Sequence, residues 1–150
     1  MAAKSVWNEA ERRAIVERLD RLSEASPPRW GQMDASRMVS HVADGLRMAL
    51  GELDVAPKRM PLLALPLVKQ FVIYWAPFPR NAPTAPELIG RTPGAWEREV
   101  RDVTRALERF ASREPAGAWP PHPLFGALSG TDWGVLIYRH VDHHLRQFGA

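Results

Sequence analysis

Three of the five histidines in the sequence lie close together near its C-terminal end, at His140, His143 and His144. Residues four positions apart on an α-helix lie on the same face, with Cβ atoms about 5–6 Å apart. The imidazoles of His140 and His144 can therefore reach one divalent cation from the same side. Because neutral imidazole is a good ligand for zinc, nickel, iron or copper, this pair predicts a metal site.

His41 is the third candidate ligand, because it lies on the apolar stripe of a different helical pattern. Three protein ligands leave a coordination position open for water or substrate, which is typical of catalytic metal sites. A metal-bound water can lose its proton near neutral pH and become a nucleophile or base. Burying three imidazoles costs free energy unless a metal or hydrogen bonds satisfy them. The alternative interpretation is therefore a hydrogen-bonded histidine cluster without a metal.

The roles of three further residues stay open at this point. His143 could replace His144, but we prefer His144 because it continues the apolar line through His140 four residues further on. His143 then lies at the edge of the helix. His122 precedes a proline in a loop and is expected to be exposed, with a fourth ligand or a substrate contact as alternatives. Asp44 could orient an imidazole or lie on a solvated face.

Prolines divide the chain into four proline-free stretches, at about 1–26, 29–56, 94–114 and from 124 to the end. Proline removes a backbone donor and interrupts helices, whereas apolar residues within each stretch recur with the 3.6-residue helical period. The sequence therefore predicts an all-α fold, a four-helix bundle in a single domain that covers residues 1–150. The positions on the predicted stripes are Trp7, Ala10, Ala14, Ile15, Arg18, Leu19 and Leu22; Met38, His41, Val42, Gly45, Leu46 and Ala49; Trp96, Val100, Val103, Leu107 and Phe110; and Trp133, Leu136, Ile137, His140, Val141, His144 and Phe148.

Residues typical of helix ends flank these stretches. Short polar side chains accept the free N–H groups of a first turn, proline favours the first helical position, and Ser with an acid three residues later can form a capping box. On this basis, Asp34 or Ser36 caps the second helix, Thr92 and Pro93 begin the third, and the fourth runs from Ser129 and Asp132 to Gly149.

About 40 residues separate the second and third predicted helices, which is too long for a plain loop in a compact domain. Within them, residues 60–78 are mostly apolar but are interrupted by three prolines and by Lys69. A membrane-spanning helix needs about 20 uninterrupted apolar residues, so this segment does not predict one. We expect a short extra helix over Leu62–Trp75 in a long crossover, where it covers the bundle or forms a dimer interface.

Composition excludes several classes of protein. Hydrophobic residues make up 45% of the 150 residues and charged residues 25%, as in ordinary globular domains. The absence of cysteine excludes a disulfide scaffold, a thiol nucleophile and an iron–sulfur site. The net charge is +3 without a run of Lys and Arg, which argues against a nucleic-acid partner. The N-terminal residues lack the apolar segment of a signal peptide, so we expect a cytoplasmic protein.

Two groups of motifs resemble a known family. The sequence Trp30-Gly31-Gln32-Met33, followed by Met-Val-Ser-His-Val-Ala-Asp at 38–44, resembles the entry to the second helix of the DinB/YfiT-like metal-binding bundles. The sequences HPLFG at 122–126, WG at 133–134 and YRHVDHHLRQFG at 138–149 resemble an uncharacterised branch of that superfamily. The resemblance covers the chain from about residue 7 to its end.

The resemblance implies a four-helix bundle with one metal bound by three histidines. One ligand comes from the second helix and two, four residues apart, from the fourth, which correspond to His41, His140 and His144. Characterised relatives are transferases and isomerases that depend on low-molecular-weight thiols such as bacillithiol or mycothiol. Zinc or nickel is their typical metal, and homodimers are common.

These observations together set the functional expectation. We expect a metal-dependent enzyme, similar to a thiol-dependent S-transferase, that acts on a small-molecule substrate with a divalent zinc or nickel ion. We expect a homodimer with no nucleic-acid and no membrane partner. The alternatives are a metal-dependent hydrolase and a non-catalytic bundle that binds a metal or small ligand.

Overall fold

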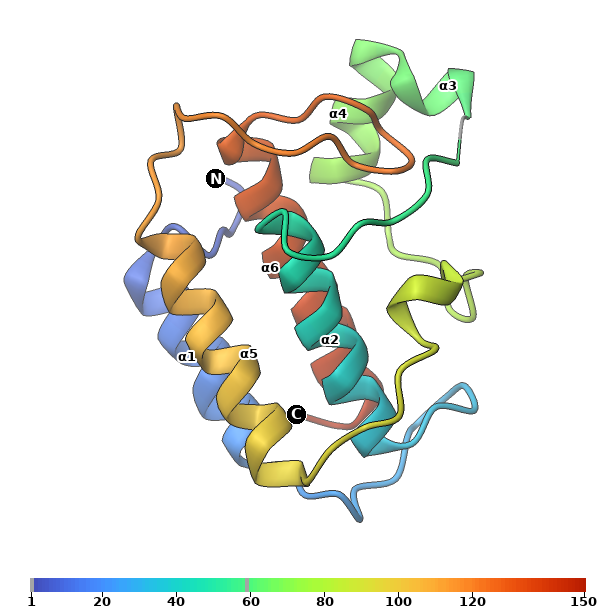
Figure 1. Ribbon diagram of the computed structural model, residues 1–150, viewed down its shortest axis with the longest axis vertical. Coiled ribbons are helices and arrows are strands. Elements are labelled where there is room, and N and C mark those ends of the chain that lie inside the picture. Colours follow the sequence, from blue (N-terminus) through green and yellow to red (C-terminus); the bar gives the residue numbers. More distant parts are fainter. Residues whose placement is uncertain (1, 59) are drawn as a thin grey trace.

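The computed structural model describes residues 2–58 and 60–150, and the regular elements in these residues are all helical (Figure 1). This confirms the prediction of an all-α fold. In chain order the elements are α1 (Glu9–Asp20), α2 (Ala35–Ala49), α3 (Pro61–Ala64), α4 (Pro66–Tyr74), the 3₁₀ helix η1 (Pro86–Leu88), α5 (Trp96–Ala111) and α6 (Gly130–Gln147).

The four long helices pack around one hydrophobic core. α2 contacts both α5 and α6, and α1 contacts the same two helices from the other side (Figure 1). α2 is the most enclosed helix, with every residue from 38 to 46 buried, because α5, α6 and η1 all pack against it. Large side chains that are completely buried include Trp133, Phe110, Ile15, Met38 and Leu46.

α1 follows its predicted stripe only in part. Ile15 and Leu19 are buried, but Ala10 and Ala14 are exposed, so the prediction that these alanines face inward is wrong. The reason is that α1 presents only a narrow face to α5 and α6. Arg18, the polar position on the stripe, faces α6 and donates to Asp142 at 2.6 Å. An ion pair therefore replaces an apolar contact at this position.

The ends of α2 and α6 agree with the sequence. The Asp34 side chain accepts from the backbone N–H of Arg37 at 2.7 Å and caps α2. Ser129 and Asp132 form the predicted capping box at the start of α6. Gly149 adopts a left-handed backbone with φ of 83° just after α6, a conformation that glycine adopts without strain.

The start of α5 differs from the prediction. α5 begins at Trp96 after Ala95, which makes no side-chain cap, so the predicted start at Thr92 and Pro93 is wrong. The reason lies in Glu99 on the first turn of α5. Its buried carboxylate accepts from the backbone N–H of Gly94 at 2.7 Å and from Arg91, and these bonds hold the preceding chain in an extended path.

The crossover between α2 and α5 contains α3, α4 and η1. The single helix predicted over Leu62–Trp75 is two helices, broken at Leu65, because Pro66 disfavours helical backbone at the residue before it. α4 packs on α6, whose Arg139 donates to backbone carbonyls at the end of α4, including that of Val72 at 2.9 Å. No helix in the described part of the chain combines the length and apolarity needed to cross a membrane.

Candidate metal centre

Three histidines from two neighbouring helices meet in the interior. His41 lies in the middle of α2, and His140 and His144 lie one turn apart on α6. One ring nitrogen from each histidine lies within 4.8 Å of those from the other two. The ring centroids of the three pairs are 4.8–4.9 Å apart, and the ring planes are nearly perpendicular, at 80–85°. The packing of α2 on α6 thus brings together the three residues that the sequence spacing selected.

The orientation of His41 is fixed by the crossover. Its Nδ1 lies 3.0 Å from the backbone carbonyl of Leu88 in η1. A carbonyl oxygen only accepts, so Nδ1 carries the proton and Nε2 keeps its lone pair. The guanidinium of Arg37 also donates to the carbonyl of Ile89, at 2.9 Å, which holds η1 against α2. The lone pair of Nε2 is therefore directed at the other histidines.

His144 is oriented in the same way by a side chain of its own helix. Its Nδ1 lies 2.8 Å from Oε1 of Gln147, and both residues are buried. The amide nitrogen of Gln147 donates to the backbone carbonyl of Trp30 at 3.0 Å, which establishes that the amide oxygen faces His144. Nδ1 of His144 therefore donates its proton, and Nε2 is left with a lone pair.

His140 is the most accessible of the three histidines, since His41 and His144 are buried and His140 is only half-buried. Its Nε2 lies 3.0 Å from Nε2 of His41. The ring packs over Gly45 of α2, where an added Cβ would lie 3.3 Å from the ring carbon Cε1. Gly45 thus leaves room for the ring between the two helices.

The surroundings keep these imidazoles neutral. Burial lowers the pKa of His41 and lowers the pKa of His144 to about 3, with the neighbouring His41 adding to the effect. Burial and the adjacent histidines hold the pKa of His140 well below its ordinary value. Neutral imidazole is the form that binds a metal, so no imidazolium proton has to be displaced at neutral pH.

The donor set fits a divalent metal ion. Zinc–nitrogen bonds are about 2.0–2.1 Å long, so the three ring nitrogens can share an ion after small side-chain movements. Hydrogen bonds from the second nitrogen of a ligating histidine to a carbonyl or amide oxygen are a common feature of metal sites. Here Leu88 and Gln147 supply those oxygens. The three buried or half-buried histidines could therefore hold a metal ion.

The structure places the other two histidines outside this group. His143 lies at the edge of α6, as expected, with its ring against Trp30 and Phe78 at 5.7 and 5.8 Å between centroids. His122 is neither exposed nor a fourth member of the group, so its expected exposure is wrong. Its Nδ1 accepts from the backbone N–H of Leu124 at 3.1 Å and organises a tight turn.

Asp44 has neither of the two roles considered from the sequence. Its carboxylate is 2% exposed, so it does not lie on a solvated face. It binds the guanidinium groups of Arg91 and Arg47, at 3.2 and 3.1 Å, and not an imidazole. Arg91 also binds the buried Glu99 at 2.6 Å. Asp44 therefore belongs to an ion-pair network between α2, the crossover and α5.

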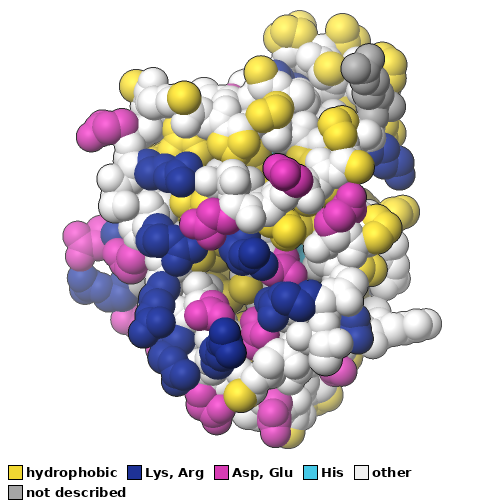
Figure 2. Space-filling view, in the orientation of Figure 1, with side chains coloured by type: hydrophobic (Ala, Val, Ile, Leu, Met, Phe, Trp, Pro, Cys, Tyr) yellow, Lys and Arg dark blue, Asp and Glu magenta, His cyan; other side chains and the backbone are white. Residues whose placement is uncertain are grey.

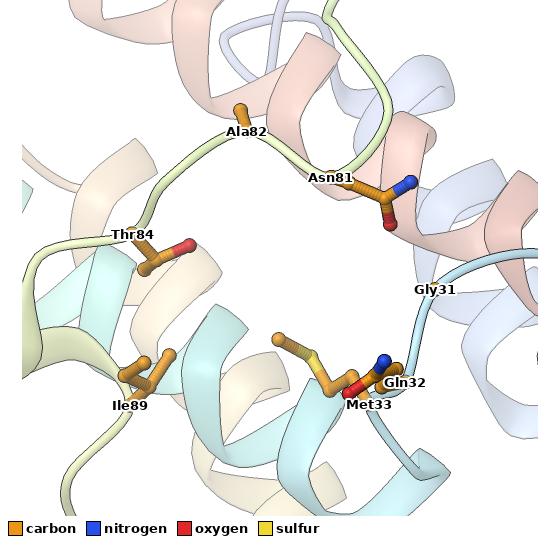
Figure 3. A pocket seen from close by; sticks show the side chains of 7 residues that line it. All are labelled: Gly31, Gln32, Met33, Asn81, Ala82, Thr84 and Ile89. Atoms are coloured by element: carbon orange, nitrogen blue, oxygen red, sulfur yellow. The ribbon is translucent and has the colours of Figure 1, made fainter.

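The structure has a surface pocket of about 660 Å³ whose lining includes none of the three histidines (Figure 3). It lies between the segment before α2 and the crossover segment around η1. Gly31 and Asn81 both have a left-handed backbone, and a Cβ added to Gly31 would lie 3.3 Å from the Asn81 side-chain oxygen. The lining residues are Gly31, Gln32, Met33, Asn81, Ala82, Thr84 and Ile89.

Both walls of this pocket connect to the histidines. On one side, Trp30 precedes Gly31, and its carbonyl accepts the hydrogen bond from Gln147, which orients His144. On the other side, Leu88 precedes Ile89 and binds His41. The lining carries amide, hydroxyl and apolar groups and no charged side chain. Hydrogen bonds therefore link both segments that line the pocket to the histidines.

Sequence reasoning missed the two groups that orient the ligands. Gln147 could have been found, because it follows His144 by three residues and therefore lies on the same face of the helix. The Leu88 carbonyl carries no sequence signal, since any residue at that position presents the same backbone oxygen.

The family comparison covers almost the whole chain. A family model described as "Protein of unknown function (DUF1569)" matches residues 7–150. Neither the curated proteins nor the solved structures contain a match to the chain.

Proposed function

The chain belongs to the DUF1569 family, whose function is unknown, and we propose that it is a metal-dependent enzyme with a divalent ion bound by His41, His140 and His144. The observation that carries this proposal is the hydrogen bonding of the second ring nitrogens. Leu88 and Gln147 accept from Nδ1 of His41 and His144, which leaves Nε2 of both residues unprotonated in a group whose ring nitrogens lie within 4.8 Å of one another. Without a metal, the single N–H of a neutral His140 could be donated fully to only one of these two lone pairs, whereas a metal ion can bind both.

In this proposal, substrate approaches the metal on the side of His140. His140 is half-buried, whereas the other two ligands are buried. In this proposal the surface pocket holds a small molecule through Gln32, Asn81 and Thr84, whose side chains both donate and accept hydrogen bonds. A bound divalent ion would lower the pKa of a thiol or water in its open position and make it a nucleophile at neutral pH.

We favour a thiol as the activated group. The support is the resemblance of the 30–44 and 122–149 motifs to the DinB/YfiT-like four-helix bundles, whose characterised members use low-molecular-weight thiols. The contacts of α1, α2, α5 and α6 are compatible with such a bundle. On this proposal the metal is zinc or nickel, and the reaction transfers or adds a thiol to an electrophilic small molecule.

Metal analysis of tag-free protein, purified without chelator, tests the site. We expect stoichiometric zinc or nickel in the wild type and its loss in His41→Ala and His140→Ala. His143→Ala is the matched control, because His143 is a half-buried histidine of the same helix outside the group. Metal-free wild-type protein after incubation with zinc and nickel would refute the proposal. Loss of metal in His143→Ala but not in His144→Ala would show that the ligand set is wrong.

The thiol assignment needs a separate assay. Zinc- or nickel-loaded protein is mixed with a low-molecular-weight thiol and a panel of electrophiles, and thiol consumption is followed. We expect consumption with the wild type and none with His140→Ala. A metal-loaded wild type that consumes no thiol but hydrolyses esters or amides would replace the transferase with a hydrolase.

A further inference from the structure

The large hydrophobic side chains that are exposed in the described part of the chain all belong to one segment, from residue 60 to residue 75. They gather over α3 and α4, where Figure 2 shows a hydrophobic projection at the upper right. Elsewhere on this face, charged side chains of both signs alternate. The exposed residues are Met60, Leu62, Leu65, Leu67, Phe71 and Trp75, which we call the apolar projection.

The fold holds this surface outward. Leu67, Phe71 and Trp75 are spaced by four residues along the outer face of α4 and are 86%, 59% and 72% exposed. On the inner face, Ile73 is completely buried and the Tyr74 hydroxyl donates to Asp132 at 2.9 Å. Because the inner face is already bonded to the start of α6, α4 cannot turn its outer side chains into the core. The outer side chains of α4 therefore form an exposed apolar surface that another apolar surface could cover.

The segment that carries the apolar projection contains basic residues and no acidic ones, although Asp132 of α6 bonds to the inner face of α4. The sequence contains no acidic residue between Asp54 and Glu87, and in this interval it contains Lys58, Arg59, Lys69 and Arg80. Basic residues next to exposed Leu, Phe and Trp side chains are the pattern of segments that lie in the interface of an anionic lipid bilayer. Each basic residue near such a surface strengthens binding by about fivefold in general.

We propose that the apolar projection docks this protein on the surface of anionic lipid membranes. Leu67, Phe71 and Trp75 enter the boundary between headgroups and acyl chains, and Lys58 and Lys69 contact lipid phosphates. Such docking needs no spanning helix, so it is compatible with the absence of one among the described residues. It departs from our expectation of no membrane partner, which rested on the lack of a spanning segment. It is independent of the proposed metal site.

A second copy of the chain is the less favourable occupant of this surface. A two-fold dimer places the same surface of both subunits together, so each basic segment would face an identical basic segment. Like charges that meet in this way oppose association, whereas phosphate headgroups supply the opposite charge. The charge of the segment therefore favours a lipid surface.

Sedimentation with vesicles tests the proposal on the full-length protein. We expect the wild type to sediment with vesicles of phosphatidylcholine and phosphatidylglycerol in equal amounts, more weakly at high salt, and far less with pure phosphatidylcholine. Leu67→Glu and Phe71→Glu should each lower the partition coefficient at least about tenfold, because each loses the burial of a large apolar side chain. Lys58→Glu should lower it by about fivefold or more.

Arg101→Glu is the matched control, since it makes the same charge change at an exposed position on α5. It should sediment like the wild type. All substituted side chains are exposed, so thermal unfolding should show that every variant is folded. Wild-type protein that stays in solution with anionic vesicles would overturn the proposal. A dimer in light scattering that Leu67→Glu dissociates, without vesicle binding, would instead show that the surface is a self-association interface.

Discussion

Replacing Gln147 by leucine should weaken metal binding although Gln147 is not a ligand. The side chain accepts from Nδ1 of His144 at 2.8 Å and donates to the Trp30 carbonyl at 3.0 Å. Leucine has a similar volume but makes neither bond. Without an acceptor for Nδ1, His144 can move its proton to Nε2, the atom that would bind the ion, and its ring can rotate.

The structure indicates the size of the effect. Loss of a group that orients a ligating histidine typically lowers metal affinity about 10- to 100-fold, or about 1.4–2.7 kcal/mol. Gln147 is 6% exposed and His144 is 9% exposed, so water cannot readily replace the lost acceptor. We therefore expect the upper part of that range for zinc.

Gln147→Glu separates this role from a purely structural one. Its carboxylate still accepts from His144, so zinc affinity should stay near the wild-type value. The fold should be less stable, because the carboxylate cannot donate to Trp30 and carries a buried charge. Zinc affinity is measured by competition with a chromophoric chelator, and the free energy of unfolding by urea denaturation of metal-free protein. Folded Gln147→Leu protein that binds zinc as tightly as the wild type would refute the reasoning.

Three further predictions concern the fold. Burial lowers the pKa of His122 from 6.5 to about 4, so protonation favours the unfolded state as the pH falls below 6.5, by about 2 kcal/mol at pH 5. The side-chain oxygen of Asn can accept the same backbone N–H, so His122→Asn should remove the part of the acid destabilisation that comes from His122. Urea unfolding at pH 7 and pH 5 measures this. A variant whose stability depends on pH as strongly as that of the wild type would contradict the prediction. Arg91→Met removes the shared partner of the Asp44 and Glu99 carboxylates, which are both 2% exposed, and should lower the free energy of unfolding by about 3 kcal/mol. Urea unfolding measures this loss. A loss below about 1 kcal/mol would show that the two carboxylates are solvated. Gly134→Ala places a Cβ 2.3 Å from the ring of Trp7 and should lower the free energy of unfolding by about 1–3 kcal/mol. A melting temperature at or above that of the wild type would show that the N-terminal segment moves aside without loss of stability.

The ligand candidates and most helix positions could be predicted because they depend on short-range periodicity. His140 and His144 are one turn apart on any helix, and His41 follows the stripe of its own helix. Asp34 and the Ser129–Asp132 pair cap helices through bonds that span three residues. Such signals do not depend on how the helices are packed.

The features that could not be predicted depend on contacts between distant segments. Thr92 and Pro93 satisfy the local rules for a helix start, but the bonds of Glu99 to Gly94 and Arg91 delay α5 to Trp96. Asp44 is three residues from His41, yet it binds Arg91 from the crossover. Each of these partners is set by the path of the chain between α2 and α5.

The separation of the histidines along the chain has a consequence for the order of events after synthesis. His41 and His140 are 99 positions apart, and α6 follows α1, α2 and α5 along the chain. A ribosome has released almost none of α6 when α1, α2 and α5 are already free to fold. An ion bound by all three imidazoles can therefore be acquired only after α6 has left the ribosome, and termination before His144 would yield a chain that lacks part of the ligand set.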